Sequence, residues 1–235
     1  MRVLIVSADD FGRSRGINSG VVKAHEEGIV TSAGLMVCWP DAEQAAAYAR
    51  QNRKLSVGLH VDLGEWINED GAWDTVYTRV AVDDAASVER EIRSQLERFR
   101  ALIGADPTHL DSHQHVHTHG GPVDATLRAL ATELRIPVRD IGDTVLYNGS
   151  FYGQGLRGES FPEAITAENL ISLIRELSDG ITELSCHPAI GDDSGSPYRR
   201  ERELEVDALC DPRVRDAIAE EGIELRSFGD ASSGR

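Results

Sequence analysis

The sequence has few cysteines and no long apolar run, and both absences restrict the class of protein. Only three cysteines occur in 235 residues, and none forms a Cys-x-x-Cys pair. An odd, widely spaced set argues against a disulfide scaffold and against a cysteine-based zinc site. The apolar run in "MRVLIVSADD" is four residues long, too short for a signal-peptide core or a membrane span. We therefore expect a cytoplasmic protein with no membrane partner.

Positive charge is also scarce. Lys and Arg number 24 against 40 Asp and Glu, which gives a formal net charge of −16. Nucleic acids and anionic membrane surfaces are bound through Lys/Arg patches, so we expect neither as a partner. An acidic chain does not repel neutral or cationic small molecules, and a small-molecule substrate is the expected partner. A homodimer is left open.

Phosphate-binding glycine motifs of the forms GxGxxG and GxxxxGK[ST] are absent, which disfavours a nucleotide-binding fold. Hydrophobic periodicity instead predicts strands over residues 2–8, 30–37, 55–63, 108–113, 136–141 and 181–187. Helices are predicted over residues 16–27, 42–51, 88–103, 122–134, 167–177 and 212–222. Four residues stand where helix N-caps are expected: Asp41, Ser87, Thr166 and Asp211.

This alternation of strands and helices predicts a parallel sheet in one α/β domain over residues 1–235. Both a (β/α) barrel and a doubly wound open sheet fit the pattern. We expect the irregular stretches 64–86 and 142–165 to form loops over the active face. The tail from residue 228 to 235, which includes "GDASSGR", is expected to fray.

Acidic and imidazole side chains gather at the carboxyl ends of four predicted strands. Asp9 and Asp10 follow the first strand. His60 ends the third strand, His113 the fourth, and His187 the strand at 181–187. Ligands and catalytic groups collect at this rim both in barrels and in open α/β sheets. The coincidence predicts a functional site rather than unrelated helix caps and surface histidines.

Two histidines and one carboxylate form a common open metal site, with positions left for water and substrate. Asp10, His60 and His113 can supply this set from three strands. The side chain of Asp9 should diverge from that of Asp10, which leaves Asp9 free to act as a base on water. His187 can protonate a leaving group. Because a metal polarises a carbonyl and lowers the pKa of its bound water, the set predicts hydrolysis of an amide or ester.

Residues 109–119 read "HLDSHQHVHTH", with five histidines and one aspartate on odd-numbered positions. An extended strand would place all six on one face. Strand residues two apart are separated by roughly 6.5 Å, so one ion cannot bind every ring. We assign metal binding to His113, and expect Asp111 to orient an imidazole. His115 and His117 are expected to reach a substrate.

Four blocks of the sequence resemble the YdjC-like carbohydrate deacetylases: "SADDFG" at 7–12, "GLHVDL" at 58–63, "HLDSHQHVH" at 109–117 and "SCHPA" at 185–189. Two further segments extend the resemblance over nearly the whole chain: "GIVTSAGLMV" and "DPRVRDAIAEEGIELRSF". The resemblance implies a barrel-like (β/α) fold, related to the TIM barrel but with fewer or irregular strands. It also implies the removal of N-acetyl groups from amino sugars such as chito-oligosaccharides.

By position, the resemblance implies that Asp10, His60 and His113 hold one magnesium or zinc ion. It likewise implies Asp9 as the general base and His187 as the general acid. The expected partner is then a small N-acetylated sugar.

Several residues near the predicted site have two interpretations. Arg139 ends the strand predicted at 136–141, where it can either pair with Asp9 and keep it ionised or form a surface ion pair. Trp66 and Trp73 can stack on a sugar ring or simply pack within their loop. Gln114 should point away from the site face.

Two other function classes compete with a hydrolase. The "HLD" at 109–111, with a distant histidine, imitates the HxD…H triad of non-haem iron oxygenases, although those sites usually lie in all-β barrels. A non-catalytic metal-storage or sugar-binding protein is the other class. Such a protein does not need Asp9 and His187 beside its metal site.

Overall fold

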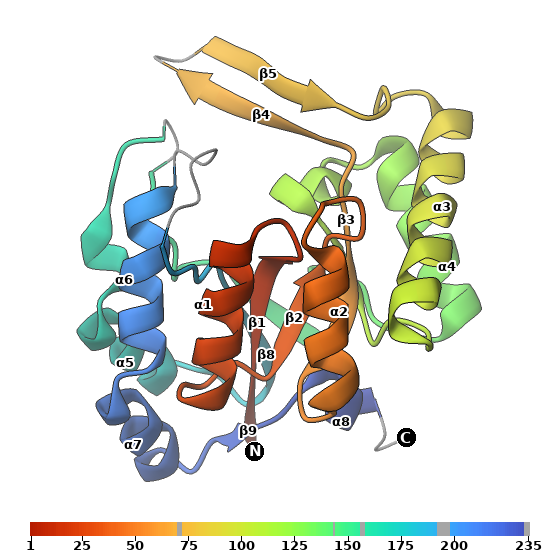
Figure 1. Ribbon diagram of the computed structural model, residues 1–235. Helices are drawn as coiled ribbons and strands as arrows, with labels where there is room; N and C mark the ends of the chain where they lie inside the picture. Colours follow the sequence, from red (N-terminus) through yellow and green to blue (C-terminus); the bar gives the residue numbers. More distant parts are fainter. Residues whose placement is uncertain (70–71, 143, 156–157, 192–197, 233–235) are drawn as a thin grey trace.

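The protein is described by a computed structural model that covers residues 1–235 except 70–71, 143, 156–157, 192–197 and 233–235 (Figure 1). Parallel strands form a curled sheet in the order β6–β3–β2–β1–β8–β7, and β9 also pairs with β1. The strands are β1 (Arg2–Phe11), β2 (Ser32–Leu35), β3 (Ser56–Val61), β6 (Leu110–Ser112), β7 (Val145–Asn148), β8 (Gly180–Cys186) and β9 (Glu224–Leu225).

Strand β1 lies at the centre of this sheet, and its sequence explains why. Every residue after Arg2 is buried, as expected for a parallel strand that is covered on both faces. The amino half of β1 pairs with β8 and β9, and its carboxyl half pairs with β8 and β2. Beyond Arg2, charged side chains occur in β1 only at Asp9 and Asp10, so the strand carries its acids to the carboxyl rim.

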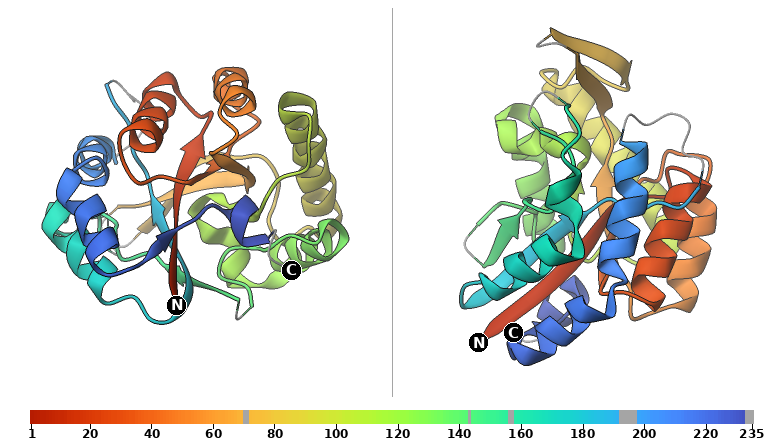
Figure 2. Two further views of the ribbon diagram at one scale, coloured as in Figure 1. Left: turned by 90° about the horizontal axis from the view of Figure 1, so that it is seen from below. Right: turned by 90° about the vertical axis from the view of Figure 1, so that its left-hand side faces the viewer.

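Helices surround the outside of the sheet, as the view from below shows (Figure 2). They pack side by side in two groups, α4–α3–α2 and α1–α6–α5–α7. Their bounds are α1 (Arg15–Glu26), α2 (Ala42–Gln51), α3 (Ala85–Ile103), α4 (Gly121–Leu134), α5 (Ala167–Arg175), α6 (Arg199–Leu209), α7 (Pro212–Glu220) and α8 (Phe228–Ser232). The described residues also form two short 3-10 helices: η1 (His113–His119) and η2 (Pro162–Ile165). The predicted barrel-like α/β fold is confirmed.

The barrel is open between its edge strands β6 and β7. Residues 136–141, predicted as a strand, form only isolated bridges, of which Val138 to Leu110 extends the β6 edge. Asp140 has a φ of 53°, which ends the extended run before a ladder can form. The prediction of a fifth regular strand here is therefore wrong. Among the described residues, no helix combines the length and the apolar character needed to cross a membrane.

Helix capping follows the sequence at some ends and departs from it at others. The side chains of Thr166 and Asp211 cap α5 and α7, as predicted. Asp41 precedes α2 without a side-chain capping bond. Helix α3 begins three residues before the predicted start, because Asp84 accepts hydrogen bonds from the N–H groups of Ala86 and Ser87. The predicted cap Ser87 instead lies in the first turn.

The chain end is more ordered than the sequence suggests. Residues Phe228–Ser232 form α8, and Phe228 is only 1% exposed. Its ring stacks on His109 with 4.0 Å between centroids. Burial of this aromatic ring holds the segment in place, so the expectation of a frayed tail is wrong for 228–232. Residues 233–235 lie outside the described part of the chain.

Several regular elements arise where none was predicted. Strands β4 (Gly64–Glu69) and β5 (Ala72–Thr78) form an antiparallel hairpin that projects above the sheet in Figure 1. Strand β7 and helix α6 are further examples. The stretch 64–86 does lie on the rim side, as predicted, but its first part is a hairpin rather than an irregular loop.

Candidate active site

A backbone irregularity at the end of β1 brings two adjacent carboxylates into one pocket. In a regular strand, Asp9 and Asp10 would point to opposite faces. Asp10 instead has a φ of 64°, and the β1–β2 pairing shifts register between Ala8 and Phe11. Such a bulge redirects side chains, and aspartate tolerates the left-handed region better than most residues. Both carboxylates consequently line the same cavity.

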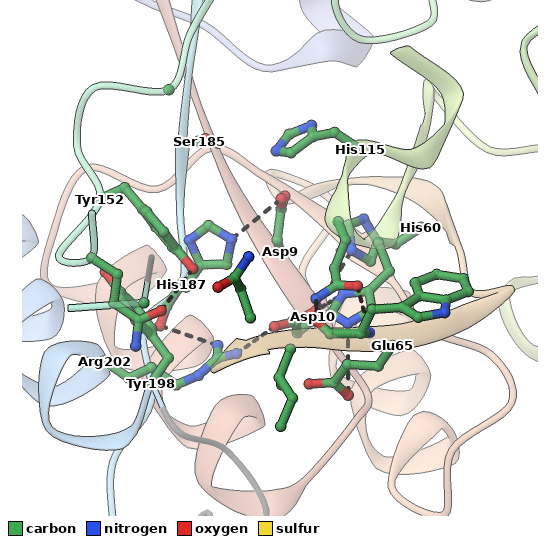
Figure 3. A pocket seen from close by; sticks show the side chains of 18 of the residues that line it. Asp9, Asp10, His60, Glu65, His115, Tyr152, Ser185, His187, Tyr198 and Arg202 are labelled. Atoms are coloured by element: carbon green, nitrogen blue, oxygen red, sulfur yellow. Dashed lines mark hydrogen bonds and ion pairs between the residues drawn. The ribbon is translucent and has the colours of Figure 1, made fainter. Parts of the chain in front are cut away.

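The three side chains predicted to bind a metal converge in this cavity; Figure 3 labels two of them, Asp10 and His60. Asp10 Oδ1 lies 3.0 Å from His113 Nδ1 and 3.5 Å from His60 Nε2. One ligand atom of each residue lies within 4.8 Å of the other two, a spacing compatible with ligand distances of about 2 Å around one ion.

Two of these donor atoms, Asp10 Oδ1 and His60 Nε2, are buried and have only the close contacts given above, with no hydrogen bond of good geometry among the described residues. Buried polar atoms are normally paired, and an exception calls for an unseen water or ion. The residues present therefore fit one divalent cation.

The surrounding charges favour positive charge at this cluster. Burial by itself raises the pKa of Asp10, but Arg202 and His113 outweigh it and hold that pKa well below its usual value. Burial lowers the pKa of His60, yet Asp111 and Asp9 outweigh it and raise that pKa well above its usual value. The acidic surroundings thus stabilise either a proton on the imidazole or a cation in its place.

A carboxylate lies behind each of the two histidines. Asp111 Oδ2 is 2.9 Å from His60 Nδ1, which leaves Nε2 to face the cluster. Glu65 Oε2 is 3.8 Å from His113 Nε2 and forms a 2.6 Å ion pair with Arg13. Partners of this kind fix the ring orientation of metal-binding histidines. Asp111 lies beside the His60 ring, and its role in orienting that ring stays a prediction. Glu65 was missed, and nearness to His60 in the chain was its only signal.

Arg139 lies at the centre of a second buried cluster. Its guanidinium is 2.6 Å from Asp9, 2.9 Å from Asp111 and 2.7 Å from Glu183. Burial raises the pKa of Asp9, but Arg139 outweighs this and the net shift is downward. Of the two interpretations of Arg139, the contacts confirm the pairing with Asp9. Asp9, His60 and Asp111 also have a metal-compatible spacing, but the guanidinium already supplies positive charge among them.

His187 follows β8 and reaches the same floor. Its Nε2 lies 3.7 Å from Asp9 Oδ2. The ring packs edge-on against Tyr152 and Tyr198, with centroid separations of 5.2 and 5.8 Å. Burial lowers the pKa of His187 to about 4, so the imidazole is neutral at pH 7. The structure thus brings His187 beside Asp9, where the strand-end argument placed it.

The histidine run does not continue as a strand. Strand β6 ends at Ser112, and within η1 Gln114 and His115 have φ values of 53° and 52°. The alternation of faces stops there, so the prediction of one common face for the run is wrong. His115 does line the cavity, with Nε2 3.2 Å from the Tyr147 hydroxyl.

His117 has a supporting position instead of a place in the cavity. It is fully buried, with Nδ1 2.6 Å from Ser112 Oγ and Nε2 3.0 Å from the carbonyl oxygen of Arg139. Both ring nitrogens are therefore engaged within the protein. The expectation that His117 reaches a substrate is wrong, because the turn after β6 directs its ring toward the Arg139 backbone.

The residues of the HxD…H triad expected for an iron oxygenase do not come together at one site. His109 of the "HLD" sequence stacks on Phe228 and does not line the cavity. Asp111 faces His60 and Arg139. Within the described ranges, His109 belongs to neither group of side chains with metal-compatible spacing.

The cavity above the cluster has a volume of about 670 Å³, well within the range of small-molecule sites. Trp66 and Trp73 of the hairpin contribute to one wall, and Tyr152 lines the cavity from the loop after β7. Gln114 was expected to point away from the site, but it lines the cavity. Its Nε2 donates to the Trp66 carbonyl at 2.7 Å, and its Oε1 accepts from the Trp66 N–H at 2.9 Å, which ties the hairpin to the turn after His113.

Two more charged residues at the site were missed because α6 was not predicted. Arg202 Nη2 lies 2.5 Å from Asp10 Oδ2, and a carboxylate oxygen of Glu205 accepts the backbone N–H of His187. The buried face of α6 combines charged residues with Val206, Ala208 and Leu209, and this mixture weakens the apolar periodicity that would mark a helix in the sequence.

Known proteins resemble this chain over nearly its full length. A carbohydrate deacetylase from Geobacillus stearothermophilus is 38% identical over 248 residues, which cover 97% of each chain. A chitooligosaccharide deacetylase from Serratia marcescens is 34% identical over 251 residues, covering 97% of this chain and 99% of that protein.

Solved structures share the fold. A crystal structure of a protein from Enterococcus faecalis V583 superposes with a TM-score of 0.79 at 26% identity, covering 97% of this chain and 98% of that one. A polysaccharide deacetylase from Bacillus cereus superposes with a TM-score of 0.58 at 12% identity, with 97% and 92% of the two chains covered; this shows a common fold alone. The family described as YdjC-like protein matches residues 3–220, and the chain therefore belongs to that family.

Proposed function

We propose that this protein is a metal-dependent carbohydrate deacetylase that hydrolyses the N-acetyl group of an amino sugar. One observation carries the proposal: Asp10, His60 and His113 converge on the floor of a cavity beside Asp9 and His187. Relatives that are named as carbohydrate and chitooligosaccharide deacetylases support the same reaction class.

Asp10, His60 and His113 are the residues that would hold the ion. A divalent ion such as Zn²⁺ or Mg²⁺ supplies a Lewis acid, which polarises the acetyl carbonyl and lowers the pKa of a water. Asp111, 2.9 Å from His60 Nδ1, keeps that ring oriented toward the site. Glu65, 3.8 Å from His113 Nε2, adds negative charge behind the second ring.

Asp9 is the proposed general base. Arg139 donates to both of its carboxylate oxygens, at 2.6 and 2.7 Å, which keeps the group ionised and fixes its direction. In this position Asp9 takes a proton from the water that attacks the acetyl carbon. A general base typically contributes about 10²–10⁴ in rate.

His187 is the proposed general acid, and it must first receive a proton, because with a pKa of about 4 it starts neutral at pH 7. Its Nε2 lies 3.7 Å from Asp9 Oδ2, a gap that a small movement of the imidazole ring closes. We infer that the proton taken by Asp9 passes to His187 and then to the amide nitrogen as the C–N bond breaks. The water oxygen stays on the acetyl carbon, so the products are acetate and a free amino sugar.

The cavity wall suits a sugar. Trp66 and Trp73 offer aromatic faces, and Trp73 is 69% exposed, although it lines the cavity. An aromatic ring exposed beside a polar floor is suited to the apolar face of a sugar ring. We assign the pair to substrate binding rather than to packing within the hairpin.

Release of acetate from a panel of N-acetylated sugars tests the proposed function. The purified chain is treated with a chelator, and Zn²⁺ or Mg²⁺ is added back before each assay. Stoichiometric acetate and free amine, produced only with added metal, are expected. Tight binding of a sugar or metal with no acetate from any member of the panel would favour the non-catalytic alternative.

A further inference from the structure

Helix α6 buries ionisable side chains on the face that meets the active site. Glu201, Arg202 and Glu205 are 6%, 3% and 0% exposed, and Glu205 lies four and three residues after the other two, on one helix face. Arg200 and Glu203, by contrast, are solvent-exposed. Buried charges destabilise a fold unless each has a partner. The partners of these buried side chains therefore indicate the role of this helix face.

Arg202 connects a proposed metal ligand with the proposed general acid. Its Nη2 donates to Asp10 Oδ2 at 2.5 Å, and its Nη1 donates to the carbonyl oxygen of His187 at 3.3 Å. Because the guanidinium occupies Oδ2, Asp10 is left with Oδ1 toward His60 and His113. The carboxylate is held so that one chosen oxygen faces the cluster (Figure 3).

Glu205 holds the other main-chain group of His187. One oxygen of Glu205 accepts the His187 N–H, and the other accepts the Tyr198 hydroxyl at 2.5 Å. Tyr198 in turn packs against the His187 ring and stacks on Tyr152 at 4.7 Å. Both the N–H and the C=O of His187 are thus bonded to α6, one helical turn apart, beyond the end of strand β8.

We propose that Arg202 and Glu205 are positioning residues that set the metal ligand and the proton donor relative to each other. Arg202 fixes the oxygen through which Asp10 binds the ion, and Glu205 fixes the backbone that carries the His187 ring. This inference rests on the proposed function for its kinetic part. Its metal-binding part does not depend on activity.

Zinc affinity measured by calorimetry tests Arg202, with the chelator-treated protein and Zn²⁺ as the probe. Arg202→Gln should weaken Zn²⁺ binding by about 10–100-fold, the usual effect of losing a partner of a metal ligand. Arg202→Lys keeps the charge but cannot reach both Asp10 and His187, and a loss near tenfold is expected. Arg200→Gln, on the exposed side of α6, should bind Zn²⁺ like the parent protein.

Circular dichroism and melting temperature establish which variants are folded. If Arg202→Gln does not fold, Arg202→Lys decides the question. Zinc affinity equal to that of the parent protein in a folded Arg202 variant would overturn the assignment, whether or not the enzyme deacetylates sugars.

Glu205 is tested by separating metal binding from turnover. Glu205→Met removes both acceptors, and kcat should fall by about 100-fold, the cost of a misplaced catalytic group, with Zn²⁺ affinity unchanged. Glu205→Gln keeps one acceptor oxygen and should recover most of kcat. Unchanged kcat in a folded Glu205→Met variant would overturn the assignment of Glu205. A parent protein inactive on every sugar would instead contradict the proposed function, with the Arg202 result still valid.

Discussion

The floor and the wall of the cavity differ in residue type and in burial: the floor is charged and buried, whereas the wall is aromatic and partly exposed. The floor includes Asp9, Asp10, His60 and His113, with Asp111 and Arg139 directly behind them, and none of these six residues is more than 8% exposed. The wall carries Trp66 and Trp73 on a two-stranded hairpin, and Trp73 is 69% exposed. Charges on the floor are held by partners in a buried setting, where their interactions are strong. Changes on the floor should therefore be far costlier than changes on the wall.

The largest expected effect is the loss of the metal site. His113→Ala removes one of three ligands, so stoichiometric Zn²⁺ binding and acetate release should both disappear. Elemental analysis after dialysis measures the bound metal. His119→Ala is the matched control, because His119 lies in the same histidine run but is exposed. Unchanged metal occupancy in His113→Ala would contradict the ligand assignment.

Removal of the proposed base should give the next largest effect. Asp9→Asn keeps the size of the side chain and can still accept a hydrogen bond from Arg139. We expect kcat to fall by about 10²–10⁴, while Zn²⁺ affinity stays within a fewfold of the parent value. Single-turnover acetate release measures the chemical step, and a variant that keeps its full rate would rule out Asp9 as the base.

Removal of the buried Arg139 guanidinium should mainly lower the free energy of unfolding. Arg139→Met leaves the carboxylates of Asp9, Asp111 and Glu183 without their guanidinium, and a loss of about 3–5 kcal/mol is expected. For a chain of this size, each kcal/mol corresponds to roughly 2–4 °C in melting temperature. Thermal unfolding at pH 7 measures the shift. A change within 2 °C would mean that the cluster is less dependent on Arg139 than its burial indicates.

The smallest effect is expected on the wall. Trp73→Ala should raise KM for an N-acetylated oligosaccharide by roughly fivefold, equivalent to about 1 kcal/mol of aromatic contact. The kcat, Zn²⁺ affinity and melting temperature should stay unchanged. Val76→Ala is the control, since Val76 is exposed on the same strand without lining the cavity. A fall in kcat with unchanged KM would show that the hairpin acts on the chemistry and not on binding.

The difference between floor and wall also separates what was predictable. The floor residues lie at ends of strands whose apolar sequences are easily recognised, such as β1 and β3. Parallel strands bring these ends to one rim, and so Asp10, His60 and His113 could be grouped before the structure was known. The neighbours Glu65, Arg202 and Glu205 had no such signal, because they come from elements without a clear hydrophobic period.

Local backbone conformation explains the error over the histidine run. The histidine run has a period of two, which predicts an extended segment, but Gln114 and His115 are left-handed and the chain turns. His117 is thereby moved from the expected site face to a buried support of Arg139. Alternation in a sequence cannot distinguish a strand from a 3-10 turn when long-range contacts decide the conformation.

The sequence by itself determined the α/β class, the order of most elements and the edge of the sheet at which the acids and imidazoles meet. These follow from apolar periodicity and from the fixed polarity of parallel strands. Only the tertiary structure decided that Asp9 and Asp10 face one cavity, that Arg139 joins three carboxylates and that α6 holds both Asp10 and His187. Those features depend on a bulge and on contacts between residues up to 192 positions apart, which no local pattern encodes.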